Sequence, residues 1–138
     1  MRHVLFRLGR ERFALPLEAV REVVLPQPPF ARVPRASEAV RGVMNLRGRV
    51  IAVVDLAPLV GLAAQALEPS AGQVIVLDHA RRALGLLIGG VLGVEPLTPE
   101  GRGGEGLVRG VATSRAGAVT VLGADAVASE AVRLFGGR

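Results

Sequence analysis

The chain has 138 residues, which fits one domain with its own core, and half of them are hydrophobic, which excludes a disordered tail. Cysteine is absent, so disulfide and thiolate chemistry are excluded. The net charge of +5 comes from scattered arginines, the largest local clusters being Arg7/Arg10/Arg12 and Arg81/Arg82, and aromatic residues make up only 3%. Without a basic stripe and aromatic stacking platforms, we expect no nucleic-acid partner.

Apolar segments of membrane-spanning length are missing from the sequence. The longest apolar runs are far shorter than the roughly 20 residues that cross a bilayer, and no signal-peptide stretch follows Met1. We therefore expect a soluble protein of the cytoplasm without direct membrane insertion.

The first half of the chain is predicted to consist of short strands separated by turns. A strand at 4–8 and one at 12–17 flank a turn, and a helical turn at 16–20 precedes a strand at 21–25. A proline-rich connector at 26–34 leads to a hairpin of strands 40–46 and 49–54. Asp55 is expected to cap a short helix that ends before Gly61.

The second half follows a similar plan after a linker at 63–72. The expected elements are strands at 73–78, 82–88, 94–97, 107–112 and 118–122, a glycine-rich loop at 98–106, and a terminal helix at 124–134. Many short strands with regular turns and few helices indicate small β-barrels.

An internal repeat relates the two halves. The tetrapeptide Val-Arg-Gly-Val at 40–43 recurs at 108–111, 68 residues later, and an offset of 71 aligns Ala14-Leu15 with Gly85-Leu86. Two similar five-stranded barrels in tandem would explain this order of matches. We expect a single domain, 1–138, with pseudo-repeat barrels at roughly 9–71 and 72–138, between which the N-terminal strand could cross.

The residues for catalysis or for binding a metal or cofactor are lacking. Each of the two histidines, His3 and His79, is predicted to be a solvated side chain, and the three aspartates form no acid–base pair. Glycines at 101, 103 and 106 match a dinucleotide-binding spacing, but a strand and not a helix is expected after them. We therefore predict a chain that is not an enzyme.

The most distinctive stretch runs from Arg41 to Leu56 and contains Asn-Leu-Arg-Gly at 45–48. This stretch closely resembles the signature R-G-x-x-N-L-R-G-x-x-x-x-x-x-D-L of the CheW-like coupling proteins of bacterial chemotaxis. The segments Phe13-Ala-Leu-Pro and Val20-Arg-Glu-Val also resemble that family, as does Gly85-Leu-Leu-Ile in the second half. The likeness spans nearly the whole chain.

The resemblance implies a mainly β fold of two five-stranded β-barrels around a shared core, with short helices and a C-terminal helix. It implies a non-catalytic adaptor that binds the cytoplasmic tip of a methyl-accepting chemoreceptor and the regulatory domain of a CheA-like histidine kinase. Such a chain would lie in the cytoplasm at membrane-associated receptor arrays. The partner-binding residues carried over from the family are Glu22, Gly42, Asn45, Arg47 and Gly48.

Three positions in the second half depart from the family pattern: Gly89, Gly93 and Gly123 stand where acidic or polar residues are common. A complete first-half signature beside an eroded second half suggests a hypothesis in which only one partner surface is kept. The alternative function is therefore a divergent accessory CheW-like protein that binds only receptor or only kinase, in a gliding-motility or developmental pathway.

Overall fold

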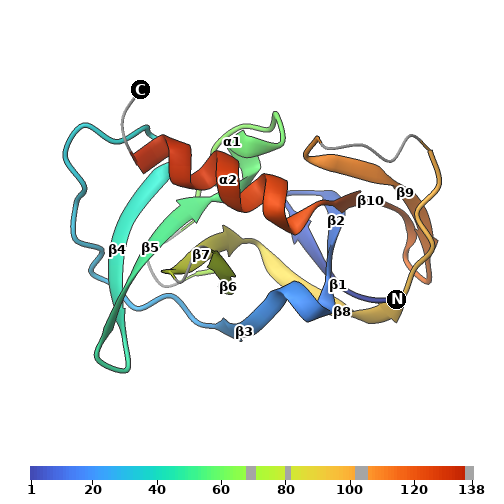
Figure 1. Ribbon diagram of the computed structural model, residues 1–138, viewed down its shortest axis with the longest axis horizontal. Coiled ribbons are helices and arrows are strands. Elements are labelled where there is room, and N and C mark those ends of the chain that lie inside the picture. The colour runs from blue at the N-terminus through green and yellow to red at the C-terminus, as the bar shows by residue number, and fades with distance from the viewer. Residues whose placement is uncertain (68–70, 80–81, 102–105, 136–138) are drawn as a thin grey trace.

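A computed structural model describes residues 1–67, 71–79, 82–101 and 106–135. Within these ranges, ten strands, a 3-10 turn and two helices follow one another (Figure 1). The first half contains β1 (Arg2–Leu8), β2 (Glu11–Pro16), η1 (Leu17–Ala19), β3 (Val20–Val24), β4 (Val40–Leu46), β5 (Arg49–Asp55) and α1 (Leu56–Leu59). The second half contains β6 (Gln73–His79), β7 (Arg82–Ile88), β8 (Gly90–Pro96), β9 (Val108–Ser114), β10 (Gly117–Leu122) and α2 (Ala124–Phe135).

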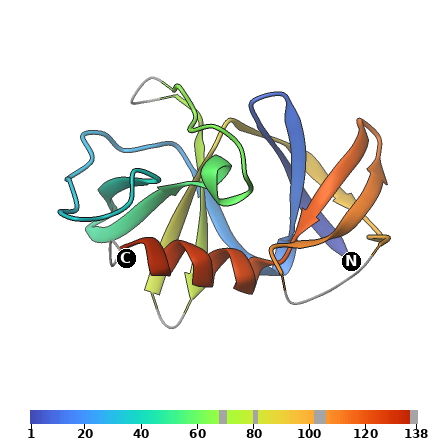
Figure 2. The same ribbon diagram turned by 90° about the horizontal axis from the view of Figure 1, so that it is seen from above.

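The strands form two five-stranded sheets that lie side by side, and α2 begins at their junction and runs along the sheet that contains β3 to β7 (Figures 1 and 2). One sheet has the order β8-β1-β2-β10-β9 and the other the order β3-β6-β7-β5-β4. Each sheet is antiparallel except for one central parallel pair, β2 with β10 and β5 with β7.

Three groups of buried side chains fill this architecture. The largest, the central core, contains residues of both sheets together with the apolar face of α2, for example Phe6, Leu86 and Val127. Each sheet also has a smaller buried group of its own. One lies around Ile51 in the sheet that contains β3 to β7, and the other lies around Leu5 in the sheet that contains β1 and β2. Two curled sheets around a shared core, with a C-terminal helix, confirm the predicted fold class.

The two sheets have the same internal plan. Strand β8 corresponds to β3, β1 to β6, β2 to β7, β10 to β5 and β9 to β4, so the two sheets have the same strand order. The parallel pairs match residue by residue as well: Ala14 opposes Val121, and Gly85 opposes Val53, which are equivalent positions under the sequence offsets. These correspondences support the repeat.

Each sheet nevertheless takes strands from both halves of the chain. The β1–β2 hairpin joins β8, β9 and β10, while the β6–β7 hairpin joins β3, β4 and β5. The sheets therefore do not divide at the chain midpoint, and the boundaries 9–71 and 72–138 stay a prediction.

Some local expectations need correction. The strand expected at 94–97 is longer and begins at Gly90, because β8 pairs with β1 through Gly90, Val91 and Gly93 despite their turn-like sequence. His3 is buried and not solvated, since β1 lies between two other strands of its sheet. Arg81 and Gly103 lie outside the described residues. In the described part of the chain, no helix is both long enough and apolar enough to cross a membrane.

Candidate functional site

The turn between β4 and β5 presents the signature arginine. Arg47 and Gly48 both have positive φ angles, 51° and 84°, a conformation that matches the right-handed twist of a two-residue hairpin turn. The side-chain oxygen of Asn45 accepts a hydrogen bond of 2.8 Å from the Gly48 backbone N–H. Asn45 and Gly48 therefore fix the backbone of the turn, and the Arg47 side chain extends outward, 65% exposed.

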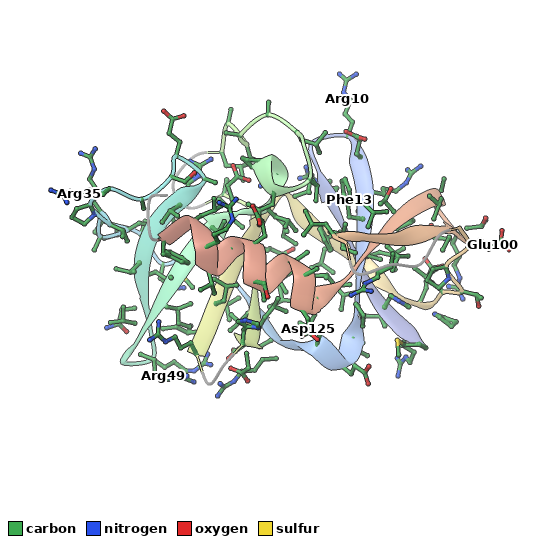
Figure 3. The ribbon with its side chains drawn as sticks, turned by 45° about the horizontal axis from the view of Figure 1, so that its top comes forward. Arg10, Phe13, Arg35, Arg49, Glu100 and Asp125 are labelled. Atoms are coloured by element: carbon green, nitrogen blue, oxygen red, sulfur yellow. The ribbon has the colours of Figure 1, made fainter. Side chains whose placement is uncertain are left out.

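Arg47 forms an ion pair with Glu22, which lies on β3. The guanidinium Nη2 donates to the Glu22 Oε2 at 2.5 Å. Strands β3 and β4 are the two opposite edges of their sheet, so this contact is possible only because the sheet curls until its edges approach. Figure 3 shows Arg49, just after the turn, at the outer end of the same hairpin. The structure thus brings together four of the five predicted site residues.

The fifth predicted residue, Gly42, lies elsewhere, within β4. Its φ is 131°, and a Cβ built at this position would lie 2.4 Å from the backbone oxygen of Ala31. Ala31 and Val43 exchange two backbone hydrogen bonds of 2.8 Å at this point. Gly42 therefore permits the connector after β3 to close onto the edge strand β4, which shapes the barrel and not the exposed turn.

A buried carboxylate lies at the other end of the same hairpin. Asp55 is wholly buried, and its oxygens accept hydrogen bonds from the backbone N–H of Ala57 and from the backbone and side-chain N–H groups of Gln65. Arg41 pairs with the same carboxylate at 3.2 Å and donates a further hydrogen bond to the Gln65 carbonyl. The side chain of Gln65 also donates to the Leu87 carbonyl at 2.9 Å.

This network confirms Asp55 as the N-cap of α1 and adds a second role that sequence reasoning missed. The cap explains only the contact with Ala57, whereas the ion pair and Gln65 fasten the segment after α1 to β7. The antiparallel register, which pairs Val40 with Val54, could have signalled that Arg41 lies beside Asp55. Nothing in the sequence pattern around Gln65 could have revealed its part.

The corner where β5 ends at Asp55 has an equivalent in the second half, where β10 ends, and the side-chain contacts there are different. Gly123 takes the place of Asp55, and a Cβ added there would lie 2.3 Å from the Nε of Arg109, the counterpart of Arg41. Glu22, which binds the Arg47 side chain, has Gly93 as its counterpart under the offset of 71, because Glu22 opposes Val76 and Gly93 opposes Leu5. The departure at Gly123 thus removes the acidic member of the ion pair and lets the guanidinium pack against the chain.

The other two departures affect different features. Gly89 lies against Arg7, whose guanidinium donates to the Gly89 carbonyl at 3.3 Å, and a Cβ there would lie 2.8 Å from the same guanidinium. Gly93 has a φ of 154° at a register shift between β8 and β1. Both glycines therefore have local structural roles in the sheet that contains β1.

Elsewhere in the described ranges, no three His, Cys, Asp or Glu side chains are grouped to hold a metal ion. The Nδ1 of the buried His3 lies 3.0 Å from the Met1 carbonyl oxygen. On α2, a hydrogen bond from Arg133 lowers the pKa of Glu130, whose side chain is partly exposed. Each of these contacts joins residues that are close in sequence. The polar side chains that the fold brings together from distant segments lie at the two ends of the β4–β5 hairpin.

Comparison with known proteins places the chain in a family. A profile of the CheW-like domain matches residues 2–132. A probable chemotaxis protein CheW of Rhizobium etli is 33% identical over 98 residues, which are 70% of this chain and 61% of that protein. A chemotaxis protein CheW of Rhizobium meliloti is 36% identical over 89 residues, which are 64% of this chain and 56% of that protein. The matches thus span little more than half the length of these relatives.

The fold has a counterpart among solved structures. The scaffolding protein TtCheW of Thermoanaerobacter tengcongensis superposes with a TM-score of 0.73 at 24% identity, covering 88% of this chain and 87% of that one. This likeness confirms the architecture, and the profile match extends over nearly all of the sequence. The chain belongs to the CheW-like domain family, as the signature around Arg47 predicted.

Proposed function

We propose that this chain is a non-catalytic adaptor of a chemotaxis-type signalling system. It binds the cytoplasmic tip of a methyl-accepting chemoreceptor and the regulatory domain of a CheA-like histidine kinase, and it lies with them in membrane-associated arrays. The names of its relatives, chemotaxis protein CheW and scaffolding protein TtCheW, support this proposal. They do not favour a gliding-motility or developmental pathway.

The observation that carries the proposal is the exposed Arg47–Glu22 pair on a rigid turn. The Arg47 side chain is 65% exposed and the Glu22 side chain 28%, so a partner can reach both. A guanidinium engages carboxylates or helix-end carbonyls through two parallel hydrogen bonds, which adds geometric specificity. Because Asn45 and Gly48 fix the turn, little backbone entropy is lost when Arg47 binds.

The test is charge reversal at the turn. Arg47→Glu should weaken binding to a receptor-tip fragment or to a kinase regulatory domain by at least about tenfold, a loss of about 1.4 kcal/mol. The unfolding free energy should change by less than about 1 kcal/mol, because the pair is largely exposed. Titration calorimetry and urea denaturation measure the two effects, with Arg32→Glu as an exposed arginine control.

A charge swap separates the two possible roles of the pair. The double variant Glu22→Arg/Arg47→Glu can re-form an ion pair between the sheet edges but presents the charges to a partner in reversed positions. We expect that binding is not restored. Restored binding would show that the pair only holds the barrel closed, and unchanged binding in Arg47→Glu would remove the site assignment.

The second-half departures allow a narrower proposal, in which the chain binds one of the two partners much more tightly than the other. The motivation is that Gly123 lacks the carboxylate that Asp55 supplies at the equivalent position of the first half, where it pairs with Arg41. Parallel titrations with the receptor fragment and the kinase domain decide it, and comparable affinities for both would exclude it.

A further inference from the structure

The β1–β2 hairpin carries a group of arginines that the proposed adaptor site does not use. Arg7, Arg10 and Arg12 are all exposed, and Arg10 points into solvent from the tip of the hairpin (Figure 3). Arg7 and Arg12 are direct cross-strand partners in the register. Among the residues that the structure describes, none of the three forms an ion pair, although Glu11 lies between them in the sequence.

The fold does not require this arrangement of charges. Like charges directly opposite each other in an antiparallel pair are destabilising. In the equivalent β6–β7 hairpin, the corresponding cross-strand pair is Asp78 with Ala83, which are not like charges. The arginine pair therefore distinguishes this hairpin from its counterpart. The Arg7 guanidinium lies beside Gly89 and that of Arg12 beside Gly117, so an anionic group can reach Arg7 on one side of the hairpin.

A groove of about 380 Å³ lies between this hairpin and the segment after α1. Figure 2 shows the tip of the hairpin beside that segment. Arg7 and Arg10 line the groove on the hairpin side, with Glu11. The opposite wall is apolar and includes Leu62, Leu67 and small alanine side chains.

The apolar wall is held in place before any partner binds. Gln65, at its centre, donates its backbone N–H to Asp55 at 2.7 Å and its side-chain N–H to the Leu87 carbonyl at 2.9 Å. Arg41 fastens the same residue through its carbonyl. A preformed wall reduces the ordering cost of association.

We propose that this groove is a second docking site, which takes an acidic, amphipathic segment of a partner protein. Apolar side chains of the segment fill the space along Leu62 and Leu67, and its carboxylates pair with Arg7 and Arg10, which line the groove. The planar guanidinium fork matches carboxylates in two-point contacts. The combination of a shaped apolar recess with charge favours a peptide over a flat anionic membrane surface, which would use the charge alone.

The test uses the full chain and defined probes. The main probe is a short fluorescent peptide of alternating Glu and Leu, compared with one in which Lys replaces Glu, one in which Ser replaces Leu, and vesicles containing phosphatidylserine. Fluorescence anisotropy should show binding of the Glu–Leu peptide only. Equal binding of the Glu–Ser peptide would show that the groove is not used, and binding of vesicles without the peptide would assign the arginines to a membrane surface; either result overturns the proposal.

Matched variants identify the residues. Arg10→Glu should weaken peptide binding by roughly tenfold, a loss of about 1.4 kcal/mol, and so should Ala64→Glu, which places an acid in the groove at an exposed position. Arg32→Glu makes the same charge change at an exposed position outside the groove and should leave binding unaltered. An equal loss in this control would reduce the effect to net charge and refute the docking site. Arg47→Glu should bind the peptide normally, so the outcome is independent of the proposed adaptor site.

Discussion

The β4–β5 hairpin and the β9–β10 hairpin hold equivalent places in the two sheets, but different contacts close the structure around them. Both have a bridge from a preceding segment, Ala31 to Val43 and Glu100 to Val111, each beside a glycine with positive φ. In the first, the buried carboxylate of Asp55 pairs with Arg41 across the base of the hairpin, and Gln65 ties this pair to the segment after α1.

The backbone arrangement is the same in the two hairpins, whereas the side-chain contacts differ. Both corners keep the bridge, so the glycines at 42 and 110 are part of the plan, since a Cβ at either would meet a backbone oxygen at 2.4 or 2.5 Å. The carboxylate at 55 is not part of it, because the equivalent Gly123 leaves the second corner intact. Polar contacts can therefore differ between the halves without changing the fold.

The largest expected effect comes from removing the buried carboxylate. Asp55→Ala should lower the unfolding free energy by about 4 kcal/mol, because Arg41 and the donors of Gln65 lose their shared acceptor. Urea denaturation measures this loss from the shift of the midpoint at constant slope. Asp78→Ala, which removes an exposed ion pair, is the control and should cost less than about 1 kcal/mol. Equal losses would mean that burial of the Asp55 network adds nothing.

Alanine at the bridge glycines should have the next largest effect, and a similar one in both halves. Gly42→Ala and Gly110→Ala should each cost about 3 kcal/mol, because a backbone oxygen occupies the Cβ position and φ is positive. Gly48→Ala, which has a positive φ but open space, should cost only about 1 kcal/mol. Thermal unfolding of the three variants ranks them. A much smaller loss at 110 than at 42 would break the equivalence of the two bridges.

The smallest expected effect is a gain from returning the acid to the second corner. Gly123→Asp should raise the unfolding free energy by about 1 kcal/mol, because the new carboxylate caps α2 and pairs with the guanidinium of Arg109. The guanidinium can rotate away from the added Cβ, since its clashing atoms are at the flexible end of the side chain. A loss of stability would show that the present packing of Arg109 against Gly123 is the better arrangement.

The hairpin turn is predictable from the residue pattern, whereas the choice of partner-binding residues comes from the family signature and stays a prediction. Asn45, Arg47 and Gly48 were placed at a hairpin turn because their neighbours alternate and a turn needs residues that tolerate positive φ. Gly42 belongs to the same family signature and is predicted with them on that ground, yet its role depends on a segment that reaches it only through the tertiary fold. His3 was misjudged for the same reason: whether a strand is central or at an edge is decided by its neighbours.

The sequence by itself determined the strands, the turns, the capped helix and the family, because periodicity and turn residues act over a few positions and the signature is continuous from Arg41 to Leu56. Only the tertiary structure decided that the β1–β2 and β6–β7 hairpins join sheets built mainly from the other half. It alone decided that Glu22 meets Arg47 and that Gln65 meets Asp55. The physical reason is that local preferences specify which segments are strands, whereas pairing between distant strands depends on how both sheets bury their apolar faces in one shared core.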